Sequence, residues 1–398
     1  MLLLDVESLR PGLETAAPIA HPNRPGTELA NTGVVLEETM IATMARLGVR
    51  QAWVRWPSLD FLDARIDRRV TDLRGDVYAL LKADFQAAQV ATVGVGQYVR
   101  YCSTISDLVC DLLSAGQTGG GVQTAALFDH DQGLFNHSAA VAYLSLTLAL
   151  RLETYLVRER RAAGAVAACD VTNLGVGAML HDVGKLQLPS TMGIHEPLDG
   201  PPSKAYASHP RRGFAMIGQR ISPTARAVVL HHHQRFDGSG FPDMEAVTRK
   251  RKGGPLAGRR IHIFSRIVGL CDTFDHLCHD ADGRPRPVVA ALHDLLHSDL
   301  HGRFDPILLR GLLVHVPPFA LGNVVRLSDG RLGAVTGLNA KRPCHPQVRF
   351  LQDDNPVTRD VDLSKRDGLH IREALGVNVE KWLFELPPTK AEAAVAAG

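Results

Sequence analysis

The chain has 398 residues, of which 45% are hydrophobic and 22% are charged. These values are typical of a soluble globular protein with room for two or three domains. Its 44 basic and 42 acidic residues leave a net charge of +2, which excludes a global field that would favour nucleic acid or an anionic membrane.

The compartment is predicted from the chain start, the apolar runs and the cysteines. Residues 1–7 are too short and too acidic for a signal peptide. The longest apolar run, residues 139–150, falls short of a membrane span, so we expect a buried helix there. The six cysteines form no Cys-x-x-Cys pair, which indicates reduced, mostly buried thiols. We therefore expect a cytoplasmic protein that binds neither membrane nor nucleic acid.

The first third of the chain predicts a small module followed by helices. Residues 33–36 and 51–56 have the pattern of strands around a helix at 37–47, so residues 1–64 form a predicted α/β module. Apolar residues at 3–4 spacing predict a helical linker at 65–120. It ends in a glycine-rich stretch that lacks a phosphate-binding lysine and is expected to be a connection.

Histidines occur at the ends of predicted helices in the middle third. His137 opens one apolar helix, and His181-Asp182 ends another, with Lys185 one turn further on. Helical spacing places His181, Asp182 and Lys185 on one face. His-Asp alone is a weak signal, because a polar helix end has the same pattern.

Further candidates follow in the same region. Pro210 favours an extended His209 with a helix starting just after it. A helix capped by Ser222 ends in three histidines, 231–233, and a tight loop with the sequence Asp-Gly-Ser-Gly-Phe-Pro follows at 237–242.

A predicted helix at 260–277 carries Asp272 and Asp275 at the border of its buried stripe. Carboxylates are rarely buried unless they are paired or bound to metal, and salt-bridged surface aspartates are the alternative. After residues 317–318, a hairpin around 328–330 and a strand at 347–351 predict a β appendage at 319–373. Residues 374–398 form a predicted tail, disordered from 390.

Taken together, this order of motifs resembles the HD-GYP family, a subgroup of the HD metal-dependent phosphohydrolases. The resemblance covers about 121–318 and includes Phe304-Asp305-Pro306. It implies a mainly α fold, with an HD-type helical bundle as catalytic domain between the α/β module and the β appendage. It also implies hydrolysis of cyclic di-GMP to pGpG, and in some members on to GMP.

The resemblance implies a centre of two divalent metal ions, iron or manganese, in which the carboxylate of Asp182 bridges the ions. The implied metal ligands are His137, His181, Asp182, His209, His232, His233 and Asp272. Asp182 and Lys185 are the implied catalytic residues, and the candidate substrate-binding residues are Lys185, Asp237, Gly240, Phe241, Pro242, Arg266 and Arg284. Two metal ions ~3.5–4 Å apart can hold a hydroxide and clamp phosphoryl oxygens, and imidazole with carboxylate suits iron or manganese.

Three departures from the family pattern bear on activity. Gly133 stands where members with a third metal have an acidic residue, although Asp129 or Asp131 could approach. Phe241 replaces the family tyrosine, and Gln234 replaces a glutamate. His231 leaves the alignment of the histidine pair ambiguous by one residue.

Three functional interpretations stay open. The first is a cyclic di-GMP phosphodiesterase. The second is a catalytically weak sensor or interaction protein that binds cyclic di-GMP or a partner. The third is an HD phosphohydrolase acting on another nucleotide, which the 237–242 loop disfavours. A signalling partner bound through the N-terminal module and a homodimer are compatible with each of them.

Overall fold

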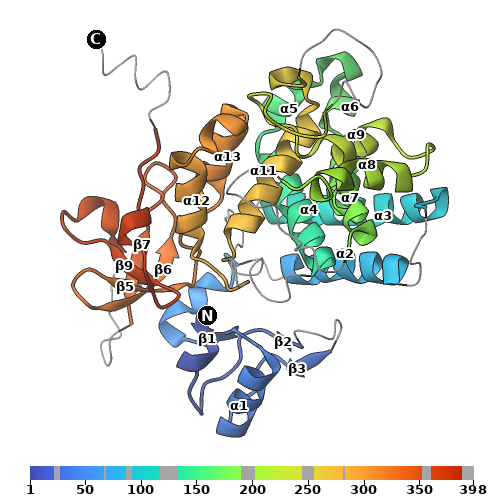
Figure 1. The fold of residues 1–398 in the computed structure, drawn as a ribbon. Coiled ribbons are helices and arrows are strands. Elements are labelled where there is room, and N and C mark those ends of the chain that lie inside the picture. The colour runs from blue at the N-terminus through green and yellow to red at the C-terminus, as the bar shows by residue number, and fades with distance from the viewer. Residues whose placement is uncertain are drawn as a thin grey trace, which may run out of the picture.

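A computed structural model describes residues 1–21, 27–66, 69–86, 92–116, 133–189, 202–243, 255–280, 283–351 and 360–387. The expected disorder of residues 390–398, the approach of Asp129 or Asp131 and most of the glycine-rich stretch lie outside these ranges. The fold is mainly helical, with a small N-terminal α/β region and a C-terminal antiparallel sheet, as the sequence predicted (Figure 1).

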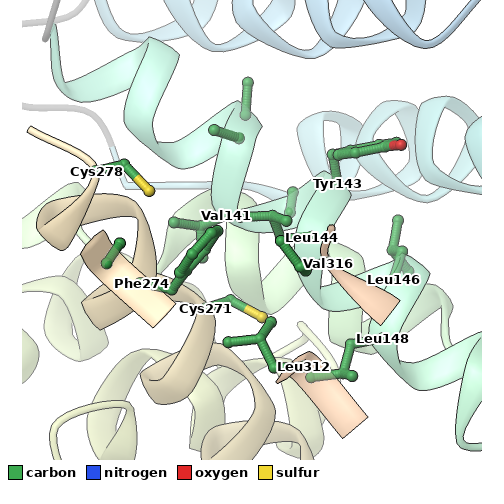
Figure 2. Close-up of a cluster of buried hydrophobic side chains, with 14 of the residues drawn as sticks. Val141, Tyr143, Leu144, Leu146, Leu148, Cys271, Phe274, Cys278, Leu312 and Val316 are labelled. Carbon is green, nitrogen blue, oxygen red and sulfur yellow. The ribbon is translucent and has the colours of Figure 1, made fainter. Parts of the chain in front are cut away.

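The helical part is built around α4 (Leu134–Arg151), whose residues from His137 to Leu146 are all buried. This helix packs against its neighbours α2, α7, α11 and α13. Figure 2 shows one layer of this core, where Val141 and Leu144 of α4 face Phe274 of α11 and Val316 after α13. A helix buried on every side has an apolar sequence all round. The bounds of these and the other longer helices are α2 (Arg69–Gln86), α3 (Val95–Gly116), α5 (Glu153–Glu159), α7 (Thr172–Leu180), α8 (His209–Met216), α9 (Pro223–His231), α11 (Ile263–Leu277), α12 (Val288–His297) and α13 (Pro306–His315).

Within the described ranges, no single helix is long and apolar enough to cross a membrane. Helices α4 and α5 reach that length and composition only as a pair, and a bend of 88° separates them.

The N-terminal region contains α1 (Glu38–Leu47) and two small antiparallel sheets. Strand β1 (Leu2–Asp5) pairs with β4 (Gln51–Val54), and β2 (Ile19–Ala20) pairs with β3 (Glu28–Ala30). The predicted strand at 51–56 is confirmed over most of its length. The predicted strand at 33–36 is wrong, because only Val35 forms a single bridge, to Glu14. β1 was missed because its run of leucines does not alternate.

The C-terminal sheet has six strands in the described residues, in the order β10-β9-β5-β6-β7-β8. The predicted hairpin is confirmed, with β5 (Val324–Leu327) paired to β6 (Leu332–Gly337). The sheet also continues past residue 373 through β10, and Phe384 beyond it is buried. The remaining strands are β7 (Gln347–Phe350), β8 (Val361–Asp362), β9 (Ile371–Ala374) and β10 (Val377–Asn378).

The N-terminal region packs directly against the C-terminal sheet (Figure 1). The Leu3 amide donates to the Gly322 carbonyl at 3.0 Å, and the Arg65 guanidinium donates to the Thr336 carbonyl at 3.1 Å. A side chain at Gly322, whose φ is +80°, would collide with the Trp53 ring at 2.6 Å. The two terminal regions therefore share an interface.

Candidate metal centre

The seven predicted ligands converge from five helices. His137 lies in the first turn of α4, His181 and Asp182 follow α7, and Asp272 lies on α11. His209 begins α8, and His232 and His233 follow α9. None of these seven residues exposes more than 6% of its surface. Side chains from five helices thus meet in one buried place.

In the described part of the chain, the ligand atoms form two groups that share Asp182. One group contains His137, His181, Asp182 and Asp272, and the other contains Asp182, His209, His232 and His233. Within each group the donor atoms lie within 4.8 Å of one another. Four donors at such separations can surround one ion, so the pair of groups is consistent with a binuclear metal centre.

The contacts around Asp182 show how the two groups meet. Its Oδ2 lies 3.4 Å from His181 Nε2 and 3.5 Å from His137 Nε2. Its Oδ1 lies 3.2 Å from His209 Nε2 and 3.7 Å from His232 Nε2. Each oxygen therefore faces a different group, which is the arrangement that a bridging carboxylate needs.

Outer hydrogen bonds fix the histidine rings. The Nδ1 atom of His181 lies 2.7 Å from the Ala178 carbonyl, and that of His209 lies 2.7 Å from the Tyr206 carbonyl. His232 makes the same contact to the residue three positions before it, at 3.0 Å. A carbonyl only accepts, so each Nδ1 carries the proton and each Nε2 is left as a ligand.

His137 is held differently, by the carboxylate of Asp275 at 2.7 Å from its Nδ1. The sequence placed Asp275 at the edge of the buried stripe but did not assign it to the site. Its position three residues after Asp272 was the available signal, since residues at this spacing share a helix face.

Two glycines allow the backbone segments of the site to meet. A side chain at Gly184 would lie 2.0 Å from the His209 carbonyl oxygen, so the turn after Asp182 packs directly on the start of α8. One at Gly177 would lie 2.7 Å from the Val228 side chain, on α9. These close contacts fix α7 against α8 and α9.

The conformation predicted for His209 is wrong. Its φ of −61° and ψ of −34° are helical, and α8 begins at this residue. Pro210 is tolerated because a proline in the first turn removes an N–H that has no partner within the helix. His209 is still a buried member of the centre.

Lys185 reaches the shared carboxylate. Its Nζ lies 2.5 Å from Asp182 Oδ2 and 5.0 Å from the centre of the Tyr206 ring. The side chains of Lys185 and Asp182 are almost fully buried. The ammonium therefore adds a fixed positive charge beside the two groups, and this charge could contact an anionic ligand.

The charges of the centre shift its pKa values. Burial raises the pKa of Asp182, but the charges of Lys185 and His181 outweigh burial and hold it well below its usual value. Burial and the neighbouring His233 lower the pKa of His232. Burial also lowers the pKa of His181, yet the Asp182 carboxylate outweighs it and raises that pKa to about 10. Without metal, therefore, Asp182 is ionised and His232 neutral, as metal ligands must be, whereas His181 would have to give up a proton when an ion binds.

The buried carboxylate oxygens provide a test of whether metal ions fit. Within the described residues, neither oxygen of Asp182 nor Oδ1 of Asp272 has a hydrogen-bond donor aligned with it. Buried carboxylates are costly unless hydrogen-bonded, paired or bound to metal. These oxygens face imidazole nitrogens, and the Lys185 ammonium also lies 2.5 Å from Asp182 Oδ2. The donor set of imidazoles and carboxylates fits two divalent ions.

The 237–242 loop lies on His233. The Phe241 ring stacks on the His233 ring, with centres 4.4 Å apart and planes 22° apart, and the Phe241 amide donates to the His233 carbonyl at 3.1 Å. The side-chain amide of Gln234 donates to the Pro242 carbonyl at 2.7 Å. At Gly240, an added side chain would lie 2.3 Å from the His233 carbonyl oxygen. Asp237 is exposed and accepts from Ser239 within the loop. The loop's contacts thus hold His233, and its substrate role stays a prediction.

The two predicted substrate arginines lie in different environments. Arg266, a candidate substrate-binding residue, is 6% exposed. Its guanidinium donates to Asp305, to Glu159 and to the Ile261 carbonyl. Arg284 is exposed, and its amide donates to Asp280. The structure therefore gives Arg266 protein partners and does not bring Arg284 into the two ligand groups.

The Phe304-Asp305-Pro306 motif has a structural role in this cluster. Asp305 caps α13 by accepting from the Ile307 amide at 3.0 Å. Its other oxygen accepts from the Tyr155 hydroxyl at 2.7 Å and from Arg266. The motif thus joins α5, α11 and α13 behind the ligand groups.

Comparison with known proteins identifies an HD domain in this chain. A profile described as the HD domain matches residues 122–308. A cyclic di-GMP phosphodiesterase of Pseudomonas aeruginosa is 30% identical over 225 residues, which are 55% of this chain and 48% of that protein. A cyclic di-GMP phosphodiesterase response regulator of Xanthomonas campestris is 28% identical over 170 residues, 40% of this chain and 42% of that protein.

A further relative is named for a different substrate, and one solved structure is similar in part. A 3′3′-cGAMP-specific phosphodiesterase of Vibrio cholerae is 28% identical over 145 residues, 35% of this chain and 26% of that protein. A solved structure described as an HDG"Y"P protein of Bdellovibrio bacteriovorus aligns at a TM-score of 0.46 and 16% identity, over 78% of this chain and 97% of that one. The chain spans about half or less of the length of the curated relatives it matches.

Proposed function

Because residues 122–308 form an HD domain of the HD-GYP family, we propose that this chain is a metal-dependent phosphodiesterase that hydrolyses cyclic di-GMP to pGpG. The observation that carries the proposal is the pair of buried His/Asp groups that share Asp182. The names of two relatives support cyclic di-GMP as the substrate.

The roles of the protein side chains follow from their positions. Bound divalent ions would supply a hydroxide nucleophile at neutral pH and Lewis-acid stabilisation of phosphoryl oxygens. Asp182 divides its oxygens between the groups, and the Nε2 atoms of His181, His209 and His232 are fixed toward those oxygens. Lys185 is positioned to offset negative charge that develops on phosphorus. Iron or manganese suits this mixture of imidazole and carboxylate.

An Asp182→Asn variant tests the proposal. With its bridging charge removed, the variant is expected to lose most bound metal and to reduce pGpG formation at least 100-fold, since metal-bound water is the proposed nucleophile. Metal content and chromatography of the products measure both effects after anaerobic purification. Asp329→Asn, in the exposed turn between β5 and β6, is the matched control and should behave as wild type.

The same assay separates the alternatives. Phe241 and Gln234, which depart from the family pattern, favour a catalytically weak protein that binds cyclic di-GMP, and a fully metal-loaded chain that binds it without forming pGpG would establish that role. Turnover of 3′3′-cGAMP with cyclic di-GMP untouched would replace the substrate and leave the metal chemistry standing. Either result contradicts the proposal as stated.

A further inference from the structure

His276 contacts the centre although sequence reasoning did not assign it there. It lies in the last turn of α11, four residues after Asp272, and is 7% exposed. Its Nδ1 lies 3.5 Å from Asp272 Oδ1. Its ring lies nearly parallel to that of His137, with centres 4.6 Å apart and planes 6° apart. One side chain therefore contacts two members of the same ligand group.

His276 and its neighbour Asp275 hold the His137 ring from two directions. Asp275 binds the ring edge at Nδ1, and His276 covers the ring face. These contacts restrict both the rotation and the tilt of the ring. The His137 Nε2 atom is left 3.0 Å from Asp272 Oδ1 and 3.2 Å from His181 Nε2.

His137 is oriented by a different kind of contact from His181, His209 and His232. His181, His209 and His232 are each oriented by a backbone carbonyl three residues earlier, so their own chain segment fixes them. His137 comes from α4 but is oriented by side chains of α11. Its placement against Asp272, which is also on α11, thus depends on side-chain contacts between two helices.

We propose that His276 is a positioning residue for the group of His137, His181, Asp182 and Asp272. Its ring holds His137, and its Nδ1 faces Asp272 Oδ1, so that both ligands are preset for one ion. The contacts of His276 to this group predict that its loss weakens one ion selectively. This inference rests on the metal-binding part of the proposed function and is independent of the substrate.

The test compares two substitutions by metal affinity. His276→Ala removes the ring and Nδ1, whereas His276→Phe keeps a ring and removes the nitrogens. Mn²⁺ binding is measured by isothermal titration and by metal content after dialysis against graded chelator. Partners outside the ligand shell typically contribute 10–100-fold to metal affinity. We expect His276→Ala to weaken one of two ions by that factor and His276→Phe to weaken it less, with the other ion changed less than threefold.

A matched control is His293→Ala. His293 also packs on a histidine ring, that of His297, with centres 4.6 Å apart, and it belongs to neither ligand group. It should leave both affinities unchanged. Equal weakening of both ions would overturn the proposal, because general destabilisation acts on both groups.

Folded His276→Ala or His276→Phe protein with wild-type affinity for both ions would also overturn it. If the alanine variant does not fold, the phenylalanine variant decides alone. A wild-type chain that binds no Mn²⁺, Fe²⁺ or other divalent ion would instead refute the metal centre on which the proposed function rests.

Discussion

At the residue scale, histidine in this protein also caps a helix. His262 precedes α11, and its Nδ1 accepts from the Phe264 amide at 3.2 Å. Burial and the nearby charges of Arg160 and Arg266 lower its pKa to about 4. Only a ring without a proton on Nδ1 can accept this bond, so the cap depends on the neutral form.

This cap predicts a pH dependence of stability. Because the folded pKa lies below the unfolded value of about 6.5, the unfolded state binds more protons, and the stability contributed by His262 is lost as pH falls from about 6.5 to 4. The loss should be roughly 1–2 kcal/mol, after discounting for partial exposure. His262→Asn keeps a capping side chain and removes this titration.

Urea unfolding at pH 6.5 and pH 4.5 measures the difference between wild type and His262→Asn. The Asn variant should lose less unfolding free energy over this interval than wild type. His293→Asn, on α12, is the control and should follow wild type. Parallel profiles for all three proteins would refute a titrating cap.

Single residues also show how far the sequence could predict the site. The sequence could predict the seven residues of the two groups as a set, because their identities and order carry the family resemblance. The roles of Asp275 and His276 could not be predicted, since a sequence does not show which ring faces lie parallel or which Nδ1 points to a carboxylate. The partners of Arg266, Glu159 and Asp305, could not be predicted either, because they are distant in sequence.

At the scale of elements, the 237–242 loop packs against His233 through the Phe241 ring. Phe241→Ala removes the stacked ring and should weaken metal binding in the group of Asp182, His209, His232 and His233. Stacked aromatic pairs contribute about 0.5–1.5 kcal/mol, which corresponds to a roughly 2- to 12-fold loss of Mn²⁺ affinity. Titration calorimetry measures this loss.

The control for this loop is Phe241→Tyr, which keeps the stacked ring and should retain affinity. Equal affinities for the alanine variant and wild type would indicate that the backbone contacts of the loop are sufficient to hold His233.

The buried cluster of Arg266, Glu159 and Asp305 predicts an effect on stability. Arg266→Met leaves the buried Asp305 carboxylate without its cation and leaves Glu159 with Arg259 alone, at 3.4 Å. Removal of one partner of a buried pair costs about 3–5 kcal/mol. Arg326→Met breaks a half-exposed pair with Glu373 on the sheet and should cost about 0–1 kcal/mol. Urea unfolding compares the two variants.

A stable Arg266→Met protein that binds cyclic di-GMP more weakly would contradict this structural role and restore the predicted substrate role.

Helices were predicted more successfully than strands in this chain, because α4 and α11 have strong apolar periodicity. The short strands of the N-terminal region depend on partners elsewhere in the sequence.

At the scale of the whole molecule, the N-terminal region meets the start of the C-terminal sheet at Gly322. Gly322→Ala introduces a side chain 2.6 Å from the Trp53 ring at a φ of +80°. Overpacking and backbone strain together should cost about 1–3 kcal/mol and separate the N-terminal region from the sheet. Limited proteolysis should then cleave within residues 1–64 faster than in wild type.

Gly330→Ala is the matched control, because Gly330 has a φ of +89° with no atom near the added carbon. It shares the backbone strain without the collision. Equal proteolysis of the two variants would show that contact with Trp53 does not join the regions.

The sequence predicted these regions as separate modules, since their contacts join residues about 270 positions apart, such as Arg65 and Thr336.

The division of Asp182 between two groups has a thermodynamic consequence. If each group holds an ion, the first ion would withdraw electron density from the carboxylate that the second ion must also use. The two affinities would then be coupled, and the factor by which either ion alters the affinity of the other would be the same in both directions. A partly loaded preparation would then contain a distribution of empty, single and double occupancy set by that common factor.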